Sequence, residues 1–598
     1  MDKKSFQKYV EKAFTYNTLP NLMNFIRIPN LSPAYDYNWN NNGLLLKAAN
    51  LIVSFAKSLE LKNAEVNLIQ DKGYTPVIYI DIPSTRQNDS RTVLFYAHFD
   101  KQPYGTGWDE DKEPTKPIII NNHLYGRGSV DDGYASFSIL TAIKTCQDHN
   151  CPLPRICCIF EGAEESTDED LTYYFNKLMP LIGNNITAFI PLDSGCSDYN
   201  RLWMTNSLRG VVDFEIDIRT LDNDCHYGPE ASGRIAENLF LLRKVLDGVM
   251  DTSTGEVKIS EFHVKEIPKN IEEEMDQEIK IIGDKFFDDI PLYPGVQPIK
   301  TDVKEAMINM RWKPTCSVLG IDNCPQIDDN GFGVKQSMKI KLSMRLPPGI
   351  NGQAAMEALK KVINENTYFD AKINTGNISL AEGWQLTNLS NRTKTILNKA
   401  SLEFFGNELT FKGEGGSIPF ITYFQTKYPN TDIICTGICG TGKCALRERT
   451  CGASSSTRPA DRSPSSGTAP RATTFGRRAR AGATRGNRSS TSSRGSTTGA
   501  FGRTMSSRWP TGRMASPSAT RSDAKARFPP PAAASPSRSP ARRSSSAAST
   551  PRSSTTRHPI ARKSPKRPTR PRCMTMANVA SIQFQFPFSI DNWQHSFT

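Results

Sequence analysis

The sequence predicts an α/β fold with a mostly parallel sheet, interrupted by an inserted α+β domain and followed by a disordered basic tail. Three observations carry this prediction. Residues 1–208 alternate between helix-like and strand-like stretches, alternating strands begin near residue 210, and Ser, Arg, Pro, Thr and Ala dominate beyond residue 446. Strands that alternate with helices favour a parallel sheet with both faces covered.

The elements of the first 208 residues follow from their apolar spacing. Apolar residues recur at helical intervals over 6–14 and 44–61, and 77–82 has the composition of a strand. Residues 134–146 have the pattern of a helix that follows an Asp-Asp-Gly turn. Four further apolar runs lead to a polar residue at or just beyond their carboxyl ends, and these residues are His98, Asp131, Glu165 and Asp193.

The predicted insert covers residues 210–375. Segments 211–218 and 338–345 alternate like half-exposed strands, whereas 231–249 and 354–364 have the spacing of helices.

The α/β pattern then returns with a helix at 394–405, a glycine-rich turn at 413–419 and an apolar strand at 432–436. We therefore expect residues 1–209 and 376–445 to form one domain around the insert.

The net charge of +13 averages two unlike pieces. Residues 1–450 hold 48 Lys and Arg against 58 Asp and Glu, whereas residues 451–598 hold 26 against 3. The tail at 446–598 has too few large apolar residues to offset the entropy of ordering it, so we predict that it is disordered. Its charge would attract nucleic acid or acidic surfaces in a salt-sensitive way. It has neither an RNA-recognition module nor interleaved aromatic residues.

The sequence favours a cytoplasmic location. The segment that begins at Met1 has no apolar stretch of a secretory signal, and no apolar run reaches the roughly 20 residues that span a bilayer. Thirteen cysteines without a CxxC pair are typical of reduced thiols. We therefore expect no membrane partner, and nucleic acid only through the tail.

The strand-end residues predict a site for two divalent metal ions. Ligands of parallel sheets bind beyond the carboxyl ends of the strands, and His with carboxylates is the ligand set of hydrolytic Zn²⁺ or Mn²⁺. Each element alone is also common on protein surfaces, so the prediction rests on their combination.

A chemical role follows for each residue of this set. Asp131 can bridge the two metals, His98 and Asp193 can bind one, and Glu165 can bind the other. Glu164 is then left as the general base for a water molecule. Asp100, two residues beyond His98, suits the role of orienting the imidazole.

The chain resembles the M20 family of metallopeptidases, in particular its dipeptidase branch, which includes carnosine and cytosolic non-specific dipeptidases. The resemblance covers about residues 5–445. The matching segments are His98-Phe-Asp100-Lys-Gln-Pro103 with Trp108, Leu124-Tyr-Gly-Arg-Gly128 leading into Asp131-Asp132-Gly133, Glu164-Glu165-Ser166, Asp193-Ser-Gly195, Ser207-Leu-Arg-Gly210, Arg345-Leu-Pro347 and Gly415-Gly-Ser-Ile-Pro419.

The resemblance implies further roles. The insert would be a lid that carries homodimer contacts, and the Asp131–Asp132 peptide bond would be cis. His226 would stabilise the tetrahedral oxyanion, although His226-Tyr-Gly stands where the family usually has His-Ser-Gly, and a surface position for His226 remains open.

The same resemblance assigns the peptide-binding residues. Arg345 would bind the substrate carboxylate, and the loop of Gly415, Gly416 and Ser417 would cradle the carboxyl end of a dipeptide. Glu414 stands where some relatives have a basic residue, and we leave it outside the predicted site.

The family's last metal ligand is missing from the chain as written. The family has a His in an Ala-His-x-x-Asn-Glu element, whereas this chain has no His between residue 440 and His558. Codons for residues 443–449, read one base later, permit Asn/Ser-Ala-His-x-x-Asn-Glu. Our hypothesis is a frameshift at about Lys443, in the gene or its assembly, which would leave one metal weakly held. The alternatives to an active dipeptidase are an inactive M20-like protein and a binder of nucleic acid or acidic surfaces through the tail.

Overall fold

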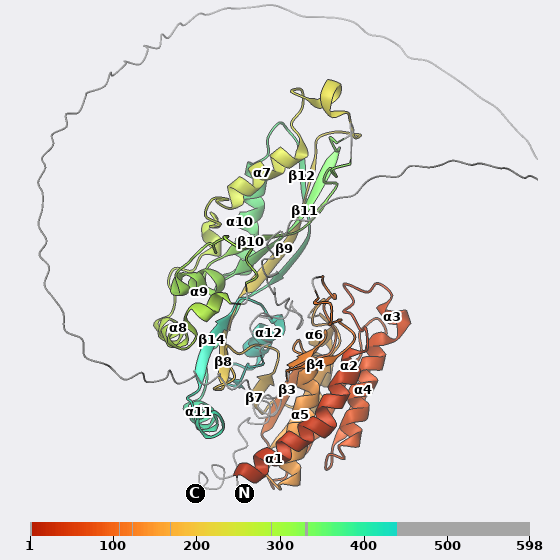
Figure 1. Ribbon diagram of the computed structural model, residues 1–598, viewed down its shortest axis with the longest axis vertical. Helices are drawn as coiled ribbons and strands as arrows, with labels where there is room; N and C mark the ends of the chain where they lie inside the picture. The colour runs from red at the N-terminus through yellow and green to blue at the C-terminus, as the bar shows by residue number, and fades with distance from the viewer. Residues whose placement is uncertain are drawn as a thin grey trace, which may run out of the picture. The chain divides into compact units, whose positions relative to one another are not determined.

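The computed structural model describes residues 3–438 except 107, 122, 168, 289 and 329–332 (Figure 1). The predicted disordered tail at 446–598 lies outside the described residues, and so does the stretch around Lys443 where the frameshift is proposed. Among the described helices, none combines the length and the apolar character needed to cross a membrane.

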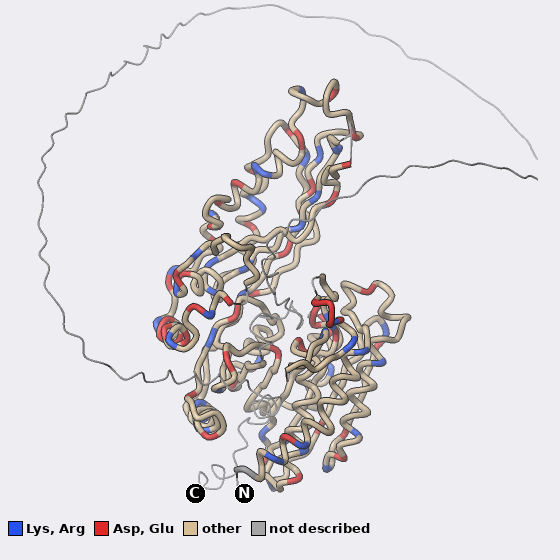
Figure 2. Tube along the Cα trace, viewed as in Figure 1, with Lys and Arg blue, Asp and Glu red and all other residues tan. Residues whose placement is uncertain are grey.

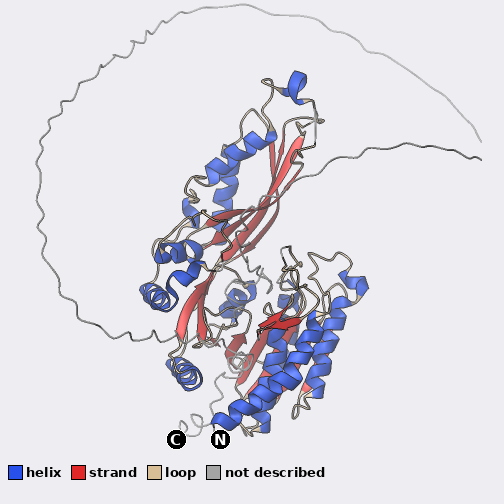
Figure 3. Cartoon of the chain, viewed as in Figure 1, coloured by secondary structure: helices blue, strands red, loops and turns tan. Residues whose placement is uncertain are grey.

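A six-stranded sheet forms the core of the first domain (Figure 3). Its order is β1-β2-β6-β3-β7-β15, in which β6, β3, β7 and β15 run parallel and the β1–β2 and β2–β6 pairs are antiparallel. The prediction of a mostly parallel sheet is therefore confirmed. The bounds are β1 Glu65–Ile69, β2 Val77–Ile82, β3 Thr92–His98, β6 Arg155–Glu161, β7 Ile186–Pro191 and β15 Asp432–Ile433.

Helices cover both faces of this sheet because its central strands are apolar on both sides. In β2, Ile78 and Ile80 pack with α4 and α5, whereas Val77 and Tyr79 belong to the cluster that includes α6 and α12. Successive strand residues point to opposite faces, which explains this division. The helices are α1 Lys3–Ala13, α2 Leu19–Ile26, α3 Trp39–Asn42, α4 Leu44–Ser58, α5 Gly133–Asp148, α6 Glu169–Ile182, α11 Asn391–Phe405 and α12 Pro419–Lys427, with a π-helical turn η1 Phe14–Thr18.

A three-stranded sheet places the glycine-rich turn. In it β8 (Trp203–Leu208) pairs parallel with β14 (Thr410–Glu414) and antiparallel with β13 (Trp384–Gln385). Residues 415–417 follow β14 directly, and Leu208 pairs with Glu414. The turn therefore begins beside the start of the insert. A separate hairpin consists of β4 Ile118–Ile120 and β5 His123–Tyr125.

The insert contains an antiparallel sheet of order β10-β11-β9-β12. Alternate residues of β9 are buried, and they pack against α7 and α10 in one hydrophobic cluster. β12 ends at Ala381, so the sheet extends past residue 375. The bounds are β9 Gly210–Arg219, β10 Thr315–Asp322, β11 Ser337–Leu346, β12 Lys372–Ala381, α7 Asn238–Val249 and α10 Gly352–Glu365.

Helix α7 begins later than the predicted start at residue 231. Residues Tyr227–Ala231 instead form a π-helical turn, η2, and Gly233 has a φ of +70°. This left-handed conformation is accessible to glycine and interrupts a helix. The apolar periodicity therefore predicts the helix but not its first residue.

A helical hairpin within the insert was not predicted. Its helices α8 (Lys269–Ile282) and α9 (Val303–Arg311) share a small apolar cluster, and α8 packs against β14. Asp302 caps α9 by accepting a 2.9 Å hydrogen bond from the Glu305 backbone N–H. Figure 2 shows both signs of charge on this hairpin. Two 3₁₀ turns, η3 Ser260–Phe262 and η4 Gly283–Phe287, flank α8.

The two chain segments that join the insert to the first domain are in close contact. A Cβ atom on Gly210 would lie 2.4 Å from the Ala381 carbonyl oxygen, and one on Gly383 would lie 3.0 Å from the Gly210 nitrogen. Side chains therefore have no room at this crossing. The close contact fixes the start of β9, and with it the neighbouring Arg209.

Candidate metal centre

The predicted metal-binding side chains converge at one edge of the six-stranded sheet. His98 is the last residue of β3, Glu164 and Glu165 follow β6, and Asp193 follows β7. Because β6, β3 and β7 are parallel neighbours, their carboxyl ends meet. Ligand atoms of His98, Asp131 and Asp193 lie within 4.8 Å of one another, and so do those of His98, Glu164 and Glu165.

The His98 imidazole contacts carboxylates through both ring nitrogens. Its Nδ1 lies 3.2 Å from Asp100 Oδ1, while its Nε2 lies 3.1 Å from Asp131 Oδ1 and 3.6 Å from Asp193 Oδ1. Burial lowers the pKa of His98, but the charge of Asp193 and hydrogen bonds with its carboxylate neighbours outweigh this effect and raise the pKa well above its ordinary value. The ring is therefore held by negative charge on both sides.

Asp100 connects the imidazole to the paired glutamates. Besides contacting His98, its carboxylate accepts the backbone N–H of Glu164 at 3.2 Å and that of Glu165 at 3.0 Å. Asp100 is fully buried. A single carboxylate thus fixes the ring on β3 relative to the loop that follows β6.

The Asp131–Asp132 peptide bond is cis, which confirms the expectation from the resemblance. This pair immediately precedes α5, and the side chain of Asp132 accepts a 3.3 Å hydrogen bond from the His98 backbone N–H. Burial and the charge of Asp193 raise the pKa of Asp132 well above its ordinary value.

Glu165 has one oxygen engaged and one available. The Gln102 amide donates a hydrogen bond to Oε2, whereas Oε1 is buried and accepts no hydrogen bond from the residues that the structure describes. Burial and the charges of Asp131 and Glu164 raise the pKa of Glu165 well above its ordinary value. Gln102 lies in the matching motif at 98–103 but was assigned no role.

The residues present fit divalent cations. One imidazole and several carboxylates are the donors that Zn²⁺ and Mn²⁺ accept. Crowded buried carboxylates repel one another and are costly without a cation. Two observations agree with this crowding. Glu165 Oε1 is buried without a hydrogen-bond partner among the described residues, and the pKa values of Asp132 and Glu165 are raised.

The predicted peptide-binding residues meet where the insert joins the first domain. Arg345 on β11 donates a 3.2 Å hydrogen bond from Nη1 to Ser417 Oγ. Arg209, which was not assigned a role, donates from Nε to the Gly415 carbonyl at 3.0 Å. A Cβ atom on Gly416 would meet no described atom within 4 Å.

His226 lies in the insert, outside the two metal-binding groups. It precedes the η2 turn, and its Nδ1 accepts a 3.1 Å hydrogen bond from the Gly228 backbone N–H. Its ring stacks on Tyr227. Its predicted role at the oxyanion therefore remains a prediction.

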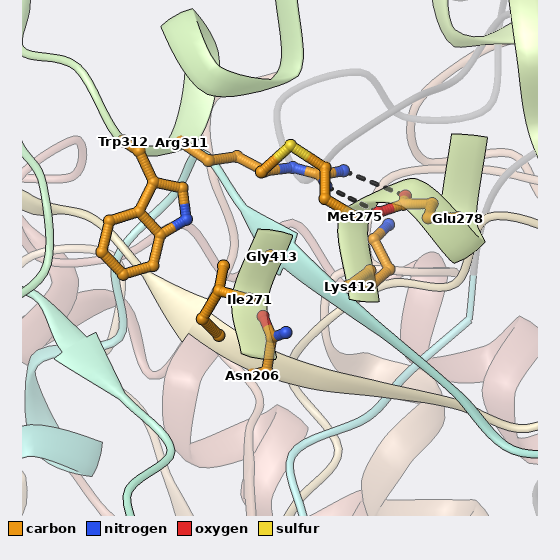
Figure 4. Close-up of a pocket in the computed structure, with 8 residues that line it drawn as sticks. All are labelled: Asn206, Ile271, Met275, Glu278, Arg311, Trp312, Lys412 and Gly413. Atoms are coloured by element: carbon orange, nitrogen blue, oxygen red, sulfur yellow. Dashed lines mark hydrogen bonds and ion pairs between the residues drawn. The ribbon is translucent and has the colours of Figure 1, made fainter. Parts of the chain in front are cut away.

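A buried charged cluster lies under the α8–α9 hairpin (Figure 4). Arg311 of α9 pairs with Glu278 of α8 through contacts of 2.6 and 3.0 Å. Ser197, four residues after Asp193, donates a 3.1 Å hydrogen bond to the same carboxylate. Both charged groups are almost completely buried. The hairpin is thereby joined to the segment that carries Asp193.

The known proteins that this chain is similar to are peptidases, and the separate comparisons agree. Residues 94–382 match the model of Peptidase family M20/M25/M40. The chain is 25% identical to the β-Ala-His dipeptidase of Homo sapiens over 362 residues. This aligned stretch covers 58% of this chain and 68% of that protein. It is also 25% identical over 361 residues to the Cys-Gly metallodipeptidase of Saccharomyces cerevisiae, covering 58% and 72% respectively.

Solved structures show the same fold. The dipeptidase Dug1p of Saccharomyces cerevisiae superposes with a TM-score of 0.62 at 20% identity, over 75% of this chain and 94% of that one.

Proposed function

We propose, from the match of residues 94–382 to the M20 peptidase family, that the chain hydrolyses the peptide bond of dipeptides. The observation that carries the proposal is the convergence of one imidazole and four carboxylates, those of Asp131, Glu164, Glu165 and Asp193, at the carboxyl ends of parallel strands. The two dipeptidases named above, which are similar to this chain, support dipeptides as the substrate class.

In this proposal two divalent metal ions, Zn²⁺ or Mn²⁺, are the cofactors. His98 and Asp193 would hold one ion, Glu165 the other, and Asp131 both. When bound, such ions polarise a carbonyl group and make water more acidic. Asp100 keeps the imidazole in place by contacting its Nδ1, and Gln102 leaves one oxygen of Glu165 available.

Glu164 is the proposed general base. Its Oε2 lies 3.9 Å from His98 Nε2, and its side chain is 11% exposed, so a water molecule has access to it. The hydrogen bond from its backbone N–H to Asp100 fixes its position. Glu164 would take a proton from the attacking water and deliver it to the departing amine.

The proposed substrate pocket lies between the turn at 415–417 and the insert. Arg345 and Ser417 would bind the peptide carboxylate, and Gly415 and Gly416 would let its backbone approach. The contact between Arg345 and Ser417 supports this arrangement. His226 would stabilise the oxyanion. We further propose that the protein is a cytoplasmic homodimer whose contacts lie in the insert, as the family resemblance implies.

The test combines metal content with hydrolysis of β-Ala-His and Cys-Gly by the full chain. Glu164→Gln is expected to keep bound metal but to lower kcat by about a hundredfold or more. Asp193→Asn is expected to lose metal. Glu60→Gln, which changes an exposed carboxylate, is the matched control and should behave as the wild type. Unchanged hydrolysis in Glu164→Gln would refute the assigned base.

A further inference from the structure

Two arginines approach the same turn, and neither has an acidic partner in the part of the chain that the structure describes. Arg209 is 8% exposed and binds only neutral groups, the Gly415 carbonyl and, through Nη1 at 3.0 Å, the Thr315 hydroxyl. Arg345 binds Ser417. Among residues 3–438 as described, no carboxylate lies within 4.0 Å of either guanidinium.

The fold brings these arginines together from distant parts of the chain. Arg209 stands directly before β9, and Arg345 lies near the end of β11, where Leu346 pairs with Gly210. Thr315, which Arg209 contacts, is the strand partner of Arg345. Both cations therefore lie at the end of the insert's sheet that joins the first domain.

The buried Arg209 beside the partly buried Arg345, with no counter-ion among the described residues, is an unfavourable arrangement of like charges. A guanidinium removed from water needs an anionic partner to offset its lost hydration. Burial and the nearby Arg345 lower the pKa of Arg209, which reflects the same imbalance. An anionic ligand would supply the missing negative charge, and planar guanidinium groups match a carboxylate well.

The turn between the two arginines lies close to the metal-binding residues. Glu414, which precedes Gly415, has its Oε1 3.0 Å from where a Cβ atom on Gly195 would stand. Gly195 lies two residues after Asp193. This contact links the turn to the segment that carries Asp193, and a ligand whose carboxylate binds the arginines would place its amide toward the metal-binding side chains.

We propose that Arg209 is a positioning and specificity-determining residue that, together with Arg345, forms a two-arginine site for the terminal carboxylate of a short peptide. This inference rests on the proposed function and deepens it. Arg209 binds the Gly415 carbonyl, and both Arg209 and Met310 of α9 lie close to this glycine, because a Cβ atom on Gly415 would be 3.3 Å from Arg209 Nη2 and 3.2 Å from Met310 Cγ. Arg209 thus fixes the turn and adds the second positive charge.

The test measures binding to the full chain freed of metal, so that no turnover is needed. Isothermal titration calorimetry would compare L-alanyl-L-alanine with L-alanyl-L-alaninamide, which lacks the carboxylate. The wild type is expected to prefer the free acid. Arg209→Gln is expected to weaken binding of the acid by about tenfold or more and to leave the amide unchanged. Arg209→Lys keeps the charge but not the fork geometry and should give an intermediate loss.

Arg243→Gln, at a largely exposed arginine of α7, is the control and should match the wild type. Gly415→Ala is a second probe. It is expected to displace Arg209 and so to reduce the preference for the free acid. It also tests the inference if Arg209→Gln does not fold. Equal weakening of acid and amide, or an unchanged preference in Arg209→Gln, would overturn the inference.

The same titrations separate this inference from the proposed function. Preference for the acid that depends on Arg209, without hydrolysis by the metal-loaded protein, would refute the function and keep the two-arginine site. If the metal-loaded protein hydrolyses dipeptides and Arg209→Gln still prefers the free acid as the wild type does, the function is kept and the two-arginine site is refuted.

Discussion

Removing the buried charge of Glu278 is expected to loosen the α8–α9 hairpin strongly. Its carboxylate accepts two hydrogen bonds from Arg311, at 2.6 and 3.0 Å, and one from Ser197 at 3.1 Å. Loss of one partner from a buried ion pair costs about 3–5 kcal/mol because the remaining charge is left uncompensated. Glu278→Ala is therefore expected to destabilise the hairpin by about that amount.

The same two helices supply a matched control. Lys304 of α9 and Asp276 of α8 form an ion pair of 2.7 Å with side chains 41% and 47% exposed. Solvent screens such a pair, and its loss costs at most about 1 kcal/mol. Asp276→Ala should therefore have little effect.

Native-state hydrogen exchange of the α8 and α9 amides is the appropriate assay, since it reports local opening. Glu278→Ala should speed exchange by about a hundredfold to a few thousandfold, whereas Asp276→Ala should change it by less than about tenfold. The double variant Glu278→Met with Arg311→Met should recover most of the protection. Equal acceleration in the two single variants would refute the reasoning.

Three further outcomes are expected. Chelation of metal should lower the melting temperature, because a ligand at about 100 times its Kd stabilises by about 2.7 kcal/mol; an unchanged melting curve would count against a metal centre. Burial and the charge of Arg127 lower the pKa of Lys101 well below its ordinary value, so the contribution of Lys101 to the free energy of unfolding should fall as pH drops below about 10, and denaturant titrations at several pH values should show this contribution lost in Lys101→Met. Restoring the reading frame at Lys443 should raise metal content and dipeptide hydrolysis above those of the chain as written, whereas two tightly bound ions in the unrestored chain would contradict the missing-ligand hypothesis.

The sign of the Lys101 prediction follows from which state binds the proton. The unfolded chain keeps Lys101 protonated up to its ordinary pKa, whereas the folded chain releases the proton at lower pH. The contribution of Lys101 to stability is therefore largest at alkaline pH and declines as the pH falls toward the folded pKa. The Lys101 amine donates to the carbonyls of Phe25 and Ile28, and a neutral amine can still make both bonds.

The sequence alone determined which side chains stand at the carboxyl ends of the central strands. Apolar runs mark buried strands because burial imposes a local pattern, and parallel strands bring their ends to one edge. His98 and Asp193 could therefore be expected to meet without knowledge of the tertiary structure. The cis peptide bond at Asp131–Asp132, which the structure contains, was expected from the family resemblance and not from the local pattern.

Local sequence patterns did not predict the elements whose exposure or glycine conformation departs from the usual periodicity. β10 is an edge strand whose last six residues are exposed, so it lacks the alternation by which strands are recognised. The start of α7 was displaced by Gly233, whose left-handed φ no periodicity reveals.

Only the tertiary structure decided which distant side chains act together. The contacts of Gln102 with Glu165, of Arg209 with Gly415, and of Arg311 with Glu278 join segments far apart in the chain. The first depends on how the loops after β3 and β6 come together, and the other two depend on how the insert and its helical hairpin pack against β8 and β14. Such packing follows from the summed shape and charge of many residues. Residue identity therefore fixes the chemistry available at the strand ends, whereas long-range packing fixes how those groups are oriented.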